Sequence, residues 1–176
     1  MLSEEKSRQI EMAGTDWACM MLACINGHEN NEPYGVIANY HLSHPVSFRG
    51  IHGLILALDE VCEMVGTPMA TTEPRFLLNE REQQYRALRG KRQKSSGKVL
   101  EKEEVAGNLY PYVTAAKEVI LIHVLFRQNS SMQGRLRCNY TGTHYIAFRS
   151  ALELMRMLEE ANTYMCQKRI NKDLKM

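Results

Sequence analysis

The feature that most constrains the fold of this sequence is an internal repeat, in which residues 39–60 recur as residues 139–160 at a constant offset of one hundred positions. Unrelated stretches would match at about one position in twenty. The aligned pairs are Asn39/Asn139, Tyr40/Tyr140, His44/His144, Phe48/Phe148, Arg49/Arg149, Leu54/Leu154, Leu58/Leu158 and Glu60/Glu160, with Asp59 opposite Glu159. We therefore interpret the chain as an internal duplication.

The first copy predicts two strands and a helix. Residues 17–25 are a nearly continuous apolar run, which is typical of a strand buried on both faces. A segment rich in turn-forming residues separates this run from a second predicted strand at residues 34–40. In residues 51–65 the apolar side chains recur every three or four positions, and Gly66 then ends the predicted helix.

The second copy predicts the same order of elements. Residues 119–126 are rich in β-branched side chains and predict a strand, which is followed by a turn and a second strand at residues 134–140. Ser150 and Glu153 have the spacing of a capping box, in which the serine accepts a backbone hydrogen bond and the glutamate reaches back. A helix is therefore expected to begin at Ser150.

The 176 residues predict one compact body. The first copy spans residues 17–66, the second copy spans residues 119–166, and residues 67–118 form an insertion between them. Within the insertion, residues 90–104 are small, polar and charged, which predicts a mobile linker. Since each copy is predicted to contain two strands and a helix, the expected fold class is α+β. A single such unit leaves sheet edges exposed, so we expect the two copies to pack together. We expect an antiparallel sheet of about four strands with both helices on one face, related by a pseudo-twofold axis.

Composition argues against several classes of protein. No window approaches the roughly 18 apolar residues of a membrane span, and the charged N-terminus lacks the apolar stretch of a signal peptide, so a cytoplasmic protein without a membrane partner is expected. The five cysteines are an odd number without a Cys-x-x-Cys pair, which predicts reduced thiols. A net charge of +2, and a basic run at residues 86–98 that lacks aromatic residues, argue against nucleic acid as a partner.

Two stretches of the second copy resemble known proteins. Residues 124–134, Val-Leu-Phe-Arg-Gln-Asn-Ser-Ser-Met-Gln-Gly, and residues 148–154, Phe-Arg-Ser-Ala-Leu-Glu-Leu, together look like a set of small uncharacterised proteins of gut clostridia and their mobile elements. The resemblance covers roughly forty residues and departs at Met132, where those proteins commonly have tryptophan. It implies an α+β unit and a bacterial or phage setting, with no catalytic residues to carry over.

The most specific candidate site is the Phe-Arg pair that precedes each predicted helix. Backbone N–H groups at a helix N-terminus, beside an arginine, can bind an anion. Two such sites related by a pseudo-twofold axis would suit a ligand with two phosphates, such as a cyclic nucleotide signal. The expected ligand-binding residues are Asn39, His44, Arg49, Asn139, His144, Arg149 and Ser150.

A structural interpretation of the same pairs is favoured over the anion site. Phe48 and Phe148 can fill the core beside the helices, while Arg49 and Arg149 pair with nearby carboxylates.

The histidines suggest two further hypotheses. His41, His44 and His52 do not have the spacing of a known metal site, so no metal is predicted. His44 and His144 could form the acid–base pair of a phosphodiester-acting enzyme if they converged on one substrate atom, and nothing in the sequence places them together.

Duplication without a catalytic constellation predicts a non-catalytic binding module rather than an enzyme. Such a module would sequester a phosphorylated nucleotide signal or inhibit a component of host or phage defence. A protein-protein adaptor or inhibitor with no small ligand is the alternative, and the phosphodiester-acting enzyme is the competing class. No cofactor is predicted, and the sequence is compatible with an oligomer.

Overall fold

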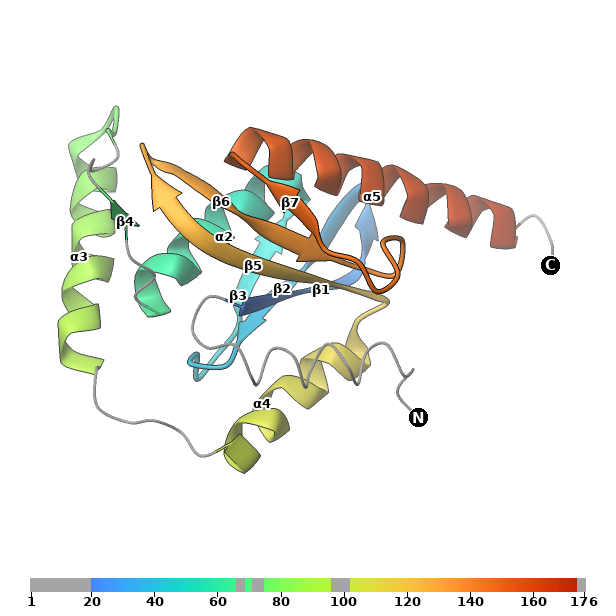
Figure 1. Ribbon diagram of the computed structural model, residues 1–176, viewed down its shortest axis with the longest axis horizontal. Helices are drawn as coiled ribbons and strands as arrows, with labels where there is room; N and C mark the ends of the chain where they lie inside the picture. Colours follow the sequence, from blue (N-terminus) through green and yellow to red (C-terminus); the bar gives the residue numbers. More distant parts are fainter. Residues whose placement is uncertain (1–19, 66–68, 71–74, 96–101, 174–176) are drawn as a thin grey trace.

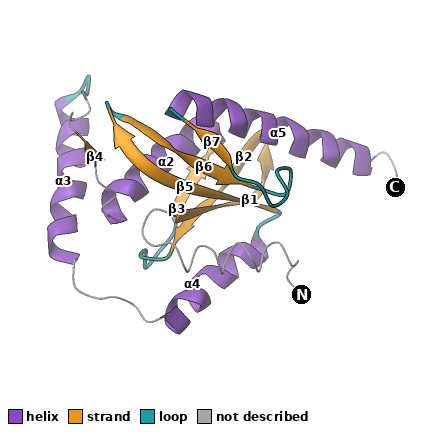
Figure 2. Ribbon diagram, viewed as in Figure 1, coloured by secondary structure: helices purple, strands orange, loops and turns teal. Residues whose placement is uncertain are grey.

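The structure is a computed structural model, and it describes residues 20–65, 69–70, 75–95 and 102–173. An α+β fold is seen, in which a twisted antiparallel sheet has helices on both faces (Figures 1 and 2). The strands are β1 (Met20–Glu29), β2 (Glu32–Asn39), β3 (Val46–Arg49), β4 (Met69–Ala70), β5 (Glu118–Gln128), β6 (Ser131–Arg137) and β7 (Ile146–Phe148). The helices are α2 (Gly50–Val65), α3 (Asn79–Ser95), α4 (Lys102–Ala115) and α5 (Ala151–Asp173).

The sheet is built around two long hairpins, β1–β2 and β5–β6. Six strands lie in the order β3-β2-β1-β5-β6-β7 with antiparallel neighbours, and the short strand β4 pairs with β5 in parallel. Each hairpin turns on two residues with positive φ: Asn30 and Asn31 at 52° and 65°, and Asn129 and Ser130 at 51° and 56°. Positive φ at both central residues is what a type I′ turn requires, and this turn suits the right-handed twist of the flanking strands.

The two hairpins meet through β1 and β5 at the centre of the sheet. Their antiparallel register runs from Met20 opposite His123 to Ile25 opposite Glu118, with Leu22 opposite Leu121. Beyond this overlap the two hairpins diverge, and their tips point in opposite directions. Each helix that follows a hairpin is therefore free to reach the tip of the other hairpin.

The core has two layers because both faces of the central strands are covered. On one face, alternate residues of β1 and β5 pack against α2 and α5. On the other face, the intervening residues pack against Leu109 and Val113 of α4, and against Ala116 just after it. Burial on both faces explains why these strands are near-continuous apolar runs rather than alternating ones.

The structure confirms the predicted α+β class and the antiparallel sheet, and it places α2 and α5 together on one face. Two elements extend well beyond the predicted bounds. Strand β1 continues to Glu29, so the turn predicted over residues 26–33 shrinks to Asn30 and Asn31. Helix α5 continues to Asp173, well past the predicted end of the second copy at residue 166.

The insertion contains more structure than its composition indicated. Helix α3 runs through Gly90 to Ser95 and helix α4 begins at Lys102, so both ends of the predicted linker at residues 90–104 are helical. Residues 96–101 of that linker lie outside the described residues. Helix α4 escapes sequence-based prediction because Pro111 lies inside it, and proline removes a backbone donor from a helix interior. None of the helices in the described ranges is long and apolar enough to cross a membrane.

Candidate functional site

The two predicted anion sites lie at opposite edges of the sheet. Arg49 ends β3 and Arg149 follows β7, and these strands are the first and the last of the six antiparallel strands. Neighbouring strands are about 4.8 Å apart, so five spacings separate the edges by roughly 24 Å. One small ligand therefore does not bridge both arginines within a single chain.

Each of these arginines pairs with a carboxylate. The guanidinium of Arg49 lies 2.6 Å from Glu29, and that of Arg149 lies 2.9 Å from Glu153. Both arginine side chains are largely exposed, while Phe48 and Phe148 beside them are buried in the core. These are the contacts expected if the phenylalanines fill the core and the arginines pair with nearby carboxylates. A role of the two arginines in anion binding stays a prediction.

The predicted capping box of α5 is present. The backbone N–H of Glu153 donates to Ser150 Oγ at 3.1 Å, and Glu153 Oε2 accepts a hydrogen bond from the backbone N–H of Arg149. The glutamate therefore reaches back one residue beyond the capping serine. Its hydrogen bonds to Arg149 lower the pKa of Glu153. Ser150 thus has a structural role at the start of α5.

Asn39 and Asn139 match in sequence but differ in environment. Asn39 ends β2, is buried, and donates from Nδ2 to the carbonyl oxygen of Met20 at 2.8 Å. Asn139 is exposed beyond the end of β6 and donates to Glu118. The reason is a shift of one residue: equivalent hairpin positions are ninety-nine apart, so Cys138 and not Asn139 occupies the place of Asn39.

His44 and His144 do not converge. His44 lies in the exposed loop between β2 and β3, and His144 lies in the exposed loop between β6 and β7, at the other side of the sheet. The acid–base pair of the enzyme hypothesis therefore has no geometric support within one chain. Among the described residues, no group of three or more His, Cys, Asp or Glu side chains is placed to hold a metal ion.

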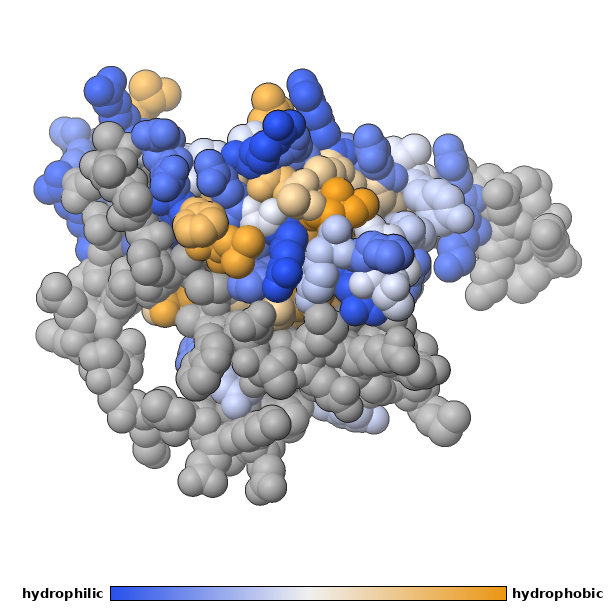
Figure 3. Space-filling model, in the orientation of Figure 1, coloured by the Kyte–Doolittle hydropathy of each residue, from blue (hydrophilic) through white to orange (hydrophobic). Residues whose placement is uncertain are grey.

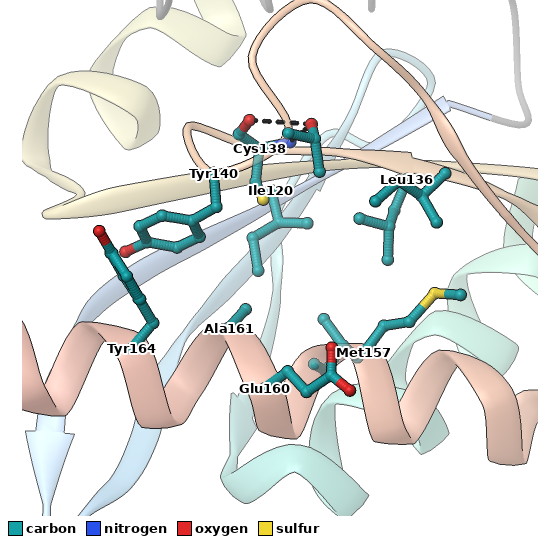
Figure 4. Close-up of a pocket in the computed structure, with 11 residues that line it drawn as sticks. Ile120, Leu136, Cys138, Tyr140, Met157, Glu160, Ala161 and Tyr164 are labelled. Atoms are coloured by element: carbon teal, nitrogen blue, oxygen red, sulfur yellow. Dashed lines mark hydrogen bonds between the residues drawn. The ribbon is translucent and has the colours of Figure 1, made fainter.

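A different region, between α5 and the end of β6, contains a cavity of about 250 Å³ (Figure 4). We call it the α5 cavity. The sheet and the loop after β6 form one wall, and α5 forms the other. The lining residues are Ile120, Leu136, Cys138, Tyr140, Thr141, Ile146, Met157, Leu158, Glu160, Ala161 and Tyr164.

The loop after β6 is folded back over α5 by Thr141. Thr141 Oγ1 donates to the carbonyl oxygen of Cys138 at 3.0 Å and lies 3.1 Å from the backbone nitrogen of Cys138, which completes a tight turn. This turn brings the ring of Tyr140 against that of Tyr164 on α5, edge to face, with their centroids 4.5 Å apart. The two rings lie together at one end of the α5 cavity (Figure 4).

The α5 cavity is apolar with a few polar groups. Ile120, Leu136 and Leu158 are buried, and burial raises the pKa of the Cys138 thiol, which is therefore protonated at neutral pH. The hydroxyl oxygen of Tyr140 is buried and makes no hydrogen bond within the part of the chain that the structure describes. Burial raises the pKa of Tyr140, and the nearby carboxylate of Glu118 raises it further.

The α5 cavity opens to the surface. Ile146 and Tyr164 line it and are 45% and 54% exposed, so a molecule can enter without unfolding the core. Figure 3 shows hydrophobic surface between α5 and the strands β6 and β7, in the region of the α5 cavity. Among the lining residues, Glu160 alone carries a charge.

The corresponding region of the first copy is built differently. Val61 and Met64 stand one hundred positions before Ala161 and Tyr164, and Val61 is fully buried. The ring of Tyr40 contacts His41 instead of a helix residue. The sequence repeat identified Tyr140 and Glu160, but it gave no reason to select Cys138 or Tyr164. A usable signal was the apolar stripe of α5, which continues through Met157, Ala161 and Tyr164 at helical spacing.

A buried polar cluster lies on the opposite side of the core, where α2 meets the tip of β5–β6. The guanidinium of Arg127 lies 2.6 Å from Glu63 and 2.8 Å from Asp59, and Tyr85 of α3 donates to Glu63 at 2.7 Å. Burial alone would lower the pKa of Arg127, but the two carboxylates outweigh it and raise this pKa. Burial, followed by Glu63, raises the pKa of Tyr85. Because these groups pair with one another inside the core, we assign the cluster to stability.

Comparisons with protein families, with curated proteins and with solved structures find no match to this chain.

Proposed function

We propose that this protein is a non-catalytic binding module, and that its ligand is a small, mainly apolar molecule held in the α5 cavity. The observation that carries the proposal is the cavity itself, which is open at one side and is lined by Tyr140, whose hydroxyl is buried. Ligand sites are typically concave and apolar, with a few polar groups that fix the orientation of the ligand.

Size and polarity both support a ligand here. A cavity of about 150 Å³ is large enough to bind benzene, so the α5 cavity, at about 250 Å³, has room for one ring and a short chain. A buried polar group without a partner costs about 1–3 kcal/mol. A ligand that hydrogen-bonds Tyr140 would recover this cost, which favours an occupied cavity.

The cavity does not favour a phosphorylated nucleotide. The one charge among its lining residues is the carboxylate of Glu160, which would repel a phosphate. Sequestration of a nucleotide signal would instead have to use Arg49 or Arg149, which already pair with carboxylates. The small apolar ligand is therefore our first proposal, and inhibition of a protein partner is the alternative if no ligand binds.

We also propose that the chain is an internal duplication arranged about a pseudo-twofold axis. The strand order β3-β2-β1-β5-β6-β7, with each half followed by a helix, supports this proposal. Glycine provides further support: a Cβ at Gly35 would meet the carbonyl oxygen of Cys24, and a Cβ at Gly134 would meet that of His123. Both glycines therefore meet the same steric requirement at equivalent hairpin positions.

The function is tested by filling the cavity. Ala161→Phe places a ring into it from α5, whereas Leu152→Phe adds a ring at an exposed position of the same helix that does not line it. A fragment library of small aromatic and aliphatic molecules is screened by ligand-observed NMR against the wild type and both variants. We expect hits that bind the wild type and Leu152→Phe but not Ala161→Phe. Fragments that bind Ala161→Phe as well as they bind the wild type, or a complete lack of hits, would contradict the proposal.

A further inference from the structure

We propose that the ligand of the α5 cavity is an organic cation, an amine with an apolar body, whose charge is placed beside Glu160. This inference rests on the proposed function, because it names the chemical class that the same cavity takes. Three features of the cavity lead to it: the charge of its lining, the two tyrosine rings, and its apolar end.

The charge of the lining is negative. Glu160 lies on α5 between Met157 and Ala161 along the cavity, and no lysine or arginine is among the lining residues that the structure describes. A second carboxylate, Glu118, lies near Tyr140 and raises its pKa. Glu118 pairs with Lys168 at 3.8 Å, so Glu160 is the carboxylate that attracts a cation entering the cavity and repels an anion. Charge complementarity of this kind fixes which ligands are admitted.

The two tyrosine rings add to this preference. Tyr140 and Tyr164 meet edge to face with centroids 4.5 Å apart, and Tyr164 is 54% exposed at the opening. The face of an aromatic ring carries partial negative charge and attracts ammonium groups within about 6 Å. Tyr164 lies one turn from Glu160 on α5, and the loop after β6 brings Tyr140 against Tyr164.

The apolar end of the cavity provides contacts for the apolar body of the ligand. Leu136 and Met157 lie away from the tyrosine pair, toward the opposite end of the cavity (Figure 4). Both are hydrophobic, and Leu136 is buried. An amine whose ring or short alkyl chain lies between these residues buries its apolar body and leaves its charge toward Glu160 and the opening. A neutral molecule of the same shape gains the apolar contact alone.

The test uses three probes with the same body and different end groups: phenylbutylamine, phenylbutanol and phenylbutyrate. Binding of each to the full chain is measured by isothermal titration calorimetry at neutral pH. We expect the amine to bind about fivefold more tightly than the alcohol, as for a well-placed exposed ion pair, and the carboxylate to bind most weakly.

Two variants separate a local contact from the net charge of the helix. Glu159 and Glu160 are both exposed; Glu160→Gln removes the carboxylate that lines the cavity, and Glu159→Gln removes its neighbour that does not line it. We expect Glu160→Gln to remove the preference for the amine and Glu159→Gln to retain it. Circular dichroism confirms that both variants are folded.

The outcomes distinguish this inference from the proposed function. If the alcohol binds the wild type as tightly as the amine, or if Glu159→Gln weakens the amine as much as Glu160→Gln, the inference is overturned and the cavity remains a binding site for neutral molecules. If none of the three probes binds, the inference is overturned, and the fragment screen with Ala161→Phe decides the proposed function separately.

Discussion

The two hairpin tips are held by different chemistry at equivalent positions. His28 near the tip of β1–β2 and Arg127 near the tip of β5–β6 are ninety-nine positions apart, the same spacing as the two turns. Each contacts the helix that follows the other hairpin. His28 Nε2 lies 2.9 Å from Asn162 Oδ1 of α5, whereas Arg127 pairs with Glu63 and Asp59 of α2.

The difference lies in what covers each helix. At α2, helix α3 from the insertion adds Tyr85, and the side chains of Arg127 and Glu63 are each 1% exposed. At α5 no such helix is packed over the contact within the described residues, and Asn162 makes partly exposed hydrogen bonds to His28 and to the carbonyl oxygen of Asn31. The contact of α2 is therefore buried beneath α3, whereas that of α5 is partly exposed on a helix that lines a cavity.

The largest expected effect is at Glu63. Glu63→Leu leaves Arg127 buried with Asp59 as its remaining carboxylate partner in the cluster, so we expect the free energy of unfolding to fall by about 3–5 kcal/mol. Urea denaturation followed by circular dichroism measures this change.

A double variant provides the control. Arg127→Met together with Glu63→Leu replaces both charges with apolar side chains, and such replacements of buried pairs are often neutral or stabilising. We expect it to recover most of the lost stability. If the double variant is no more stable than Glu63→Leu, the loss in free energy of unfolding does not come from leaving the buried charge of Arg127 without Glu63.

A smaller effect is expected at Tyr85, which ties the insertion to α2. Tyr85→Phe removes the hydrogen bond to the Glu63 carboxylate and should lower the free energy of unfolding by about 1.5–3 kcal/mol. The folded pKa of Tyr85 is raised above its ordinary value of 10.0, so the unfolded chain releases this proton first. Wild-type stability should therefore fall as pH rises through about 10, and more steeply than that of Tyr85→Phe. Parallel losses in both proteins would contradict the assignment.

The smallest effect is expected at the equivalent contact of α5. Asn162→Ala removes hydrogen bonds to His28 and to the carbonyl oxygen of Asn31, which are partly exposed, and should cost about 0.5–1 kcal/mol. The same urea titration compares it directly with Glu63→Leu. Equal losses for the two variants would remove the distinction between the two hairpin contacts.

Sequence patterns predicted those elements whose signals are local. The helical spacing of residues 51–65 gave α2, and the spacing of Ser150 and Glu153 gave the start of α5, because periodicity and capping depend on neighbours along the chain. The sequence did not predict helix α4, whose Pro111 argues against a helix and whose formation depends on packing against the sheet.

The α5 cavity was also beyond sequence reasoning. It depends on the shift of one residue that places Cys138, rather than Asn139, at the end of the second hairpin. It depends equally on the turn that brings Tyr140 to Tyr164, two residues that are remote in sequence. Neither relation follows from a pattern along the chain. The repeat of one hundred positions aligns Asn39 with Asn139, and so gives no sign that Cys138 takes the equivalent place in the hairpin.

Native-state hydrogen exchange of the α2 and α5 amides tests most directly whether the two helices differ as described. Leu58 and Leu158 are a matched pair, since both side chains are almost fully buried and lie one hundred positions apart. We expect the amide of Leu58 to exchange only through global unfolding, and that of Leu158 to exchange at least about tenfold faster through local opening of α5. Equal protection of the two amides, or stronger protection of Leu158, would contradict a fixed first helix and an open second one.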